Sequence, residues 1–144
     1  MKKADLSLMN ADLKRVVLLA GDEAARRQHS SLNHEHFLLA ILMTNDSETT
    51  EWLLQARIDP RMLESALRKE LSAWHDKKRA LGTTDEHNDF NLPFSEEMAN
   101  IFRVELSGVH DRLTSPLDIM IRIIQAPTKS VEKILAESRK DAKG

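Results

Sequence analysis

One sequence pattern occurs twice in this chain of 144 residues. The first copy begins with the polar residue Asn10 and an apolar, alanine-containing stretch that ends at residue 20. It continues with a second apolar stretch at residues 34–42. A fainter copy begins at residues 94–98 and resumes at residues 113–124. Repetition of this kind is typical of folds built from copies of one supersecondary unit. Because neither copy contains a catalytic motif, the repeat indicates a recognition module.

The apolar residues of the first copy have the spacing of an amphipathic helix. From Leu13 onward they recur at intervals of three and four residues, and Asn10 precedes them as an N-cap. Further apolar stretches predict helices at about residues 37–42, 48–56 and 60–74. The last of these has Asp59 as its N-cap and Pro60 at its first position. The first copy is therefore predicted to contain four helices.

Three more helices are predicted in the second copy. Ser95 and Ser115 each precede an apolar stripe as N-caps, and a third stripe follows Pro127. No β-hairpin signal appears, so we expect an all-α fold made of a tandem repeat of short helices. The residues expected in its core are Leu13, Val17, Phe37, Leu38, Ile41, Leu67, Ile101, Phe102 and Ile123.

We interpret residues 1–144 as one domain. Repeat one spans about residues 9–75 and repeat two about residues 92–138. Between them, about residues 76–91 are charged and mostly lack a hydrophobic period, which predicts an exposed linker. The expected state of this domain is a monomer.

Composition excludes several classes of function. The net charge of −2 argues against nucleic acid or an anionic membrane as a partner. The absence of cysteine removes disulfides and thiolate metal sites, and no apolar run approaches the roughly 20 residues of a membrane span. No glycine-rich phosphate loop is present, so we expect no cofactor and no P-loop ATP hydrolysis. These features favour a soluble cytoplasmic protein.

The first copy resembles the repeated N-terminal domain of Clp-type AAA+ unfoldases, the group of ClpA, ClpB, ClpC and ClpV. In that family a polar cap, an alanine-rich helix, a histidine and a Thr-Glu-His-like triplet precede a second apolar helix. The residues that match are Asn10, Ala20, Ala24, His29, His34, Glu35 and His36, followed by the apolar residues 37–42. The resemblance covers about residues 10–138.

The second copy departs further from the family pattern. Asn10 and Glu35 are 25 residues apart, whereas Ser95 and Pro116 are 21 apart, a loss of about one helical turn. Pro116 and Leu117 are expected to replace Glu35 and His36 there. The family's final helix is expected to be short or absent.

The resemblance implies a pseudo-twofold helical bundle that binds adaptors or substrates above an ATPase ring. The downstream AAA+ ring, which is not in this chain, would then be one partner, and a protein adaptor or substrate peptide the other. A free-standing regulator of the same fold is the alternative. Within the family, the charged linker resembles that of ClpA-type domains. Residues 46–47 and 58–63 resemble ClpV-type domains, which bind a helix of a secretion sheath.

The sequence predicts a partner-binding groove formed by Leu8, Met9, Asn10 and Glu35. If the starts of the first two helices lie side by side, their unpaired N–H groups and these side chains border one groove. A helix or an extended tail of a partner would fit there. In ClpC-type relatives, the residues matching Glu35 and Asn10 help to bind phosphorylated arginine. Alternatively, Met9 and Leu8 only cover the core, and Glu35 is a first-turn carboxylate that the helix dipole favours.

Four polar residues that are close in sequence are candidate metal ligands: His29, His34, Glu35 and His36. No two histidines stand four residues apart on a helix, so the spacing does not offer two nitrogens to one ion. No nucleophile, base and acid appear together as a catalytic triad. We therefore expect no metal and no catalytic residue, and a metal-dependent enzyme is the least supported alternative.

Overall fold

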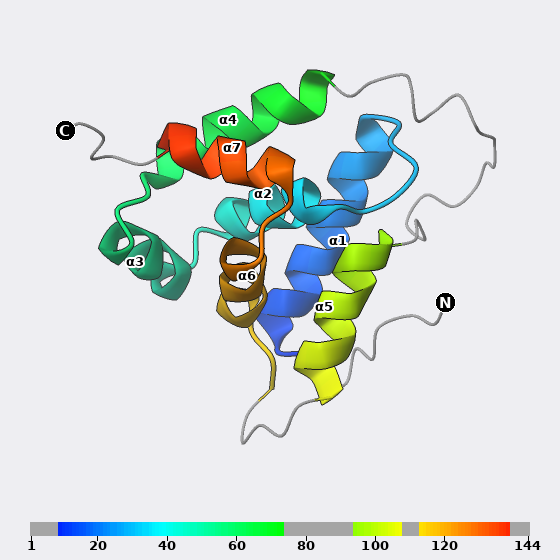
Figure 1. Cartoon of the computed structure of the whole chain (residues 1–144). Helices are drawn as coiled ribbons and strands as arrows, with labels where there is room; N and C mark the ends of the chain where they lie inside the picture. The colour runs from blue at the N-terminus through cyan, green and yellow to red at the C-terminus, as the bar shows by residue number, and fades with distance from the viewer. Residues whose placement is uncertain (1–8, 74–93, 108–112, 139–144) are drawn as a thin grey trace.

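The computed structural model describes residues 9–73, 94–107 and 113–138, and these residues form seven α helices and no strand (Figure 1). No helix among them is long and apolar enough to cross a membrane. The all-α fold class predicted from the sequence is therefore confirmed. The helices are α1 (Ala11–Arg26), α2 (His34–Thr44), α3 (Ser47–Gln55), α4 (Pro60–Ala73), α5 (Glu96–Ser107), α6 (Pro116–Gln125) and α7 (Lys129–Ser138).

Short polar side chains start these helices. The Asn10 carboxamide oxygen accepts the Leu13 N–H at 2.8 Å, and the Ser95 hydroxyl oxygen accepts the Met98 N–H at 3.2 Å. Such bonds satisfy backbone donors that have no partner within the first turn of a helix. At the other end of α2, Asn45 has a φ of 56°, a left-handed conformation that asparagine tolerates and that ends the helix.

Two reciprocal hydrogen bonds join the first half of the chain to the second. The Asn10 N–H donates to the Thr114 carbonyl at 2.9 Å, and the Ser95 N–H donates to the Leu32 carbonyl at 2.8 Å. In each bond, the residue that caps the first helix of one half contacts the residue two positions before the second helix of the other half. The matching bridges are Met9 with Thr114 and Leu32 with Phe94. This exchange of equivalent contacts is the local signature of pseudo-twofold symmetry.

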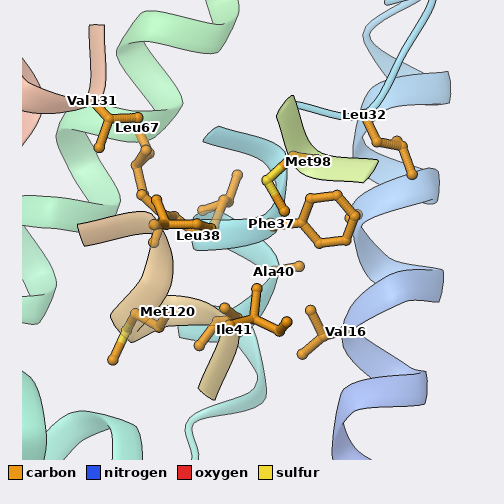
Figure 2. Close-up of a cluster of buried hydrophobic side chains, with 14 of the residues drawn as sticks. Val16, Leu32, Phe37, Leu38, Ala40, Ile41, Leu67, Met98, Met120 and Val131 are labelled. Atoms are coloured by element: carbon orange, nitrogen blue, oxygen red, sulfur yellow. The ribbon is translucent and has the colours of Figure 1, made fainter. Parts of the chain in front are cut away.

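Helix α2 lies at the centre of the domain and is buried over most of its length (Figure 1). Figure 2 shows its residues Phe37, Leu38 and Ile41 among side chains from the surrounding helices, which include Val16, Leu67, Met98, Met120 and Val131. A helix that is apolar on all sides is stable only when other elements cover it. The sequence 37–42 is apolar without interruption for this reason.

Most of the expected core residues are buried. Leu13, Phe37, Leu38, Ile41, Leu67, Phe102 and Ile123 are all at most 2% exposed. Val17 and Ile101 are only partly buried against this core, so their assignment to its centre is wrong. The reason for Val17 is that adjacent residues of a helix point about 100° apart, and Val16 takes the core direction. Trp74 and the charged segment 76–91 lie outside the described residues.

The cap of α3 provides a test of local stability. The Asp46 carboxylate accepts the Thr49 N–H at 3.2 Å. Replacing Asp46 by alanine is expected to lower the free energy of unfolding by about 0.5–2 kcal/mol, because this N–H loses its partner. Asp46→Asn keeps an acceptor at the same place and is expected to retain most of the stability. Urea denaturation of both variants measures the difference, and equal losses would show that the cap bond is not the cause.

Candidate functional site

An open pocket of about 470 Å³ lies where the starts of α1, α3 and α6 meet. Its size falls within the range of known ligand pockets. Because its walls come from three helices distant in sequence, only the folded domain forms it. The residues that line it are Asn10, Glu48, Leu113, Ser115, Leu117 and Asp118.

Local capping bonds hold the polar residues of this pocket in place. The Ser115 N–H donates to the Asp118 carboxylate at 2.9 Å, and the Ser115 hydroxyl oxygen accepts the Asp118 N–H at 3.4 Å. This reciprocal pair is a capping box, which fixes the first turn of α6. Asn10 caps α1, while Glu48 stands in the first turn of α3.

Leucine side chains supply the apolar part of the pocket. Leu113 is 49% exposed, and Leu117 is partly buried. A large aliphatic side chain that is half-exposed beside a pocket offers apolar area for a partner to cover. The pocket thus combines an apolar patch with a polar rim, which suits a peptide or protein more than a small polar molecule.

The pocket includes one of the residues predicted to form a groove. Asn10 lines the pocket at α6, whereas Glu35 is 3% exposed in the first turn of α2 and is not among the lining residues. Met9 is fully buried in the core, and Leu8 lies outside the described residues. The start of α1 adjoins the start of α6, because the bridges connect opposite halves of the chain. The groove of Leu8, Met9, Asn10 and Glu35 therefore stays a prediction, and Asn10 is the residue of these four that lines the pocket described here.

The capping boxes also correct the alignment of the two copies. In α2 the His36 ring nitrogen Nδ1 accepts the Asn33 N–H at 2.9 Å, as the Asp118 carboxylate accepts the Ser115 N–H in α6. Asn33 thus corresponds to Ser115, and Glu35 corresponds to Leu117 rather than to Pro116. His36 corresponds to Asp118, so the expected replacements were wrong by one residue. The same position is therefore a buried carboxylate, Glu35, in the first copy and a leucine, Leu117, in the second.

The structure brings two of the four candidate metal-ligating residues together as a hydrogen-bonded pair. His29 Nδ1 and His36 Nε2 are 2.8 Å apart, and both side chains are buried. Since His36 Nδ1 accepts from Asn33, the proton of a neutral His36 is on Nε2 and donates to His29. This pair ties the segment after α1 to the first turn of α2. Within the three described ranges, no group of three His, Cys, Asp or Glu residues has metal-binding geometry.

The burial of His34 is expected to make the stability of the fold depend on pH. Burial lowers its pKa below the ordinary value of 6.5, and the Glu97 carboxylate raises it only in part. Because folding disfavours the charged form, His34 contributes full stability above about pH 6.5 and loses it as the pH falls below that value. We expect His34→Gln to unfold with a weaker dependence on pH between about pH 7.5 and pH 5.5. Urea midpoints of both proteins measure this, and parallel pH profiles would contradict the assignment.

Five pocket residues were not predicted as site residues from the sequence: Glu48, Leu113, Ser115, Leu117 and Asp118, of which Ser115 was predicted only as an N-cap. Leu113 offered a signal, since it is an apolar residue immediately before the polar Thr114 and Ser115, outside any helical stripe. A second pocket of about 520 Å³ lies elsewhere, between the end of α2, α3 and the start of α4. Its lining residues, Leu42, Asn45, Thr50, Asp59, Pro60, Arg61 and Glu64, are mostly polar.

Comparison with known proteins places this fold in a family. The family model described as the Clp repeat N-terminal domain matches residues 8–137, nearly the whole chain. Domains of this family are regulatory and non-catalytic, and they generally bind protein substrates or adaptors. No curated protein matches the chain. The match includes both copies of the repeat and the three helix starts around the pocket, and the chain therefore belongs to the Clp N-terminal repeat family.

Proposed function

We propose that this chain is the adaptor- or substrate-binding domain of a cytoplasmic Clp-type ATP-dependent unfoldase or chaperone, and that it has no catalytic role itself. The observation that carries this proposal is the family match over residues 8–137 together with an open, partly apolar pocket. A recognition domain needs a surface that is exposed, apolar in part and bordered by hydrogen-bonding groups. The pocket at the starts of α1, α3 and α6 has these properties.

The proposed partner is a protein segment, in the form of a helix or an extended tail. Its apolar side chains would cover Leu113 and Leu117, while its polar groups meet Asn10 and Ser115 at the rim. We keep Asn10 and Leu8 as proposed contacts. Met9, which is fully buried, would support the site from below. Glu35, which is 3% exposed, stays a proposed contact of the groove predicted from the sequence.

Site-directed photo-crosslinking tests the location of this site. A photoreactive phenylalanine analogue replaces Leu113 in one variant and Leu54 in another. Leu54 is a matched control because it is 52% exposed but does not line the pocket, while Leu113 is 49% exposed. In lysate of the source cells, we expect one discrete crosslinked protein with the Leu113 variant and none with the Leu54 variant. The same products from both positions would place the site elsewhere.

The second part of the proposal concerns catalysis. The sequence has no glycine-rich phosphate loop, so the purified chain is expected to release no phosphate from ATP above background. Phosphate release is measured before and after a second purification, with heat-denatured protein as the control. Activity that copurifies with the chain at constant specific activity would contradict a purely recognising role.

A further inference from the structure

Asn10 carries a hydrogen-bond donor that its role as a helix cap leaves unused. Its carboxamide oxygen Oδ1 accepts the Leu13 N–H at 2.8 Å. Its backbone is engaged as well, since the Asn10 N–H donates to the Thr114 carbonyl and the Asn10 carbonyl accepts the Lys14 N–H. Within the described residues, the side-chain amine Nδ2 forms no such bond. Asn10 is partly exposed and lines the pocket, so this amine is available to a bound molecule.

The cap bond also fixes which end of the carboxamide can bind a partner. An amide oxygen only accepts and an amide nitrogen only donates, so the atom that accepts the Leu13 N–H must be Oδ1. Turning the carboxamide over would place Nδ2 against that N–H and break the cap. Asn10 therefore offers a partner a donor rather than an acceptor.

Ser115, the second polar residue proposed for the rim, is committed to its own helix. Its hydroxyl oxygen accepts the Asp118 N–H at 3.4 Å, and its hydroxyl donates to the Asp118 carboxylate at 3.2 Å. The Ser115 N–H donates to the same carboxylate at 2.9 Å. Ser115 thus shapes the pocket, while Asn10 supplies a donor to its occupant.

An extended segment supplies the acceptor that this donor requires. In a helix, most main-chain carbonyl groups already accept the N–H four residues later, so they are not available to Asn10. In an extended segment these carbonyl groups are free, and they need a partner once the segment leaves water. Side chains of such a segment alternate between two faces, so an aliphatic side chain can cover Leu113 and Leu117 while a carbonyl meets the rim.

We infer that, if the pocket is the binding site under the proposed function, its occupant is an extended segment of an adaptor or client, and Asn10 Nδ2 donates to a main-chain carbonyl of that segment. The aliphatic side chains of the segment cover Leu113 and Leu117. Because every residue has a main-chain carbonyl, this bond positions the segment without selecting its polar side chains.

Two fluorescein-labelled peptides test this inference by fluorescence anisotropy with the whole chain: Ser-Leu-Gln-Leu-Gln-Ser and Ser-Leu-Pro-Leu-Pro-Ser. Such short peptides form no stable helix, and proline disfavours a helix further while every carbonyl is kept. Both peptides are expected to bind. Asn10→Asp keeps the cap acceptor but replaces the amine by an oxygen, so it is expected to bind both peptides about two- to tenfold more weakly. Its urea midpoint is expected to equal that of wild type.

Ala11→Asp is the matched control for the added charge. Ala11 is the exposed first residue of α1 and does not line the pocket, so this variant adds a carboxylate one residue away and keeps the Asn10 amine. It is expected to bind both peptides as wild type does. If Asn10→Asp binds like Ala11→Asp, the bond to a main-chain carbonyl is wrong. If the glutamine peptide binds and the proline peptide does not, the extended, carbonyl-bound form is wrong.

The leucine variants separate the failure of this inference from the failure of the proposed site. If Leu113→Ser weakens the binding of both peptides but Asn10→Asp does not, the site stands and the bond from Asn10 is wrong. If Leu113→Ser and the control Leu54→Ser bind alike, or if neither peptide binds, both the site and the inference are wrong.

Discussion

Replacing Leu38 by alanine is expected to lower the free energy of unfolding by about 2–5 kcal/mol. Leu38 is fully buried in α2, near Leu67 of α4, Met120 of α6 and Val131 of α7 in Figure 2. The loss combines the transfer energy of the removed carbon atoms with the cost of a cavity that these helices cannot close completely. Urea denaturation followed by far-UV circular dichroism measures the change.

Leu18→Ala is the matched control for this variant. Leu18 is on α1 and 65% exposed, so its truncation is expected to change the free energy of unfolding by less than about 0.5 kcal/mol. Equal effects of the two substitutions would contradict the central position of α2. If Leu38→Ala lowered the free energy of unfolding by less than about 1 kcal/mol, the central position of α2 would also be contradicted. Truncation of a fully buried leucine in a packed core typically lowers it by about 2–5 kcal/mol.

Phe102→Ala is expected to be at least as damaging, with a loss of about 3–5 kcal/mol. Phe102 of α5 is 2% exposed and belongs to an aromatic cluster with Phe37 and Phe94. The ring centroids are 5.0–5.2 Å apart, and the rings are tilted or edge-on, the arrangement that aromatic pairs prefer. This cluster joins α2 of the first half to α5 of the second, so its loss weakens the packing between the halves.

Two further variants make this expectation specific. Phe102→Leu keeps an apolar side chain in the cluster and is expected to recover part of the stability. Val104→Ala changes a residue of α5 that is 43% exposed, and a small effect is expected there. If Phe102→Ala unfolds in two separate transitions, the halves would be independent units. A single cooperative transition at lower urea is the expected result.

The fold was predictable because its signals are local. Each N-cap read from the sequence starts a helix in the structure: Asn10, Asp59, Ser95 and Ser115. Such caps act within one turn, so no tertiary information is needed to recognise them. The assignment of Val17 to the core was wrong, because an apolar stripe in a sequence does not indicate which edge of the stripe faces the neighbouring helix.

The candidate site was less predictable because it depends on which helix starts meet. The sequence predicts Asn10 beside Glu35, within the first half of the chain. The structure instead pairs the start of α1 with Thr114 of the second half, through the hydrogen bond from Asn10. This contact between the two halves places Leu113 and Glu48 in the same pocket as Asn10. No local sequence pattern predicts such a contact. Only the identity of Asn10 as a site residue carries over from the sequence to the pocket.

The most direct test of the proposed recognition site is an amide NMR titration of the isotope-labelled chain with the partner segment identified by crosslinking. The proposed site predicts that the largest chemical-shift changes occur at residues of the pocket, which are Asn10, Glu48, Leu113, Ser115, Leu117 and Asp118. Changes confined to the other pocket, at Leu42, Asn45, Thr50, Asp59, Arg61 and Glu64, would contradict it.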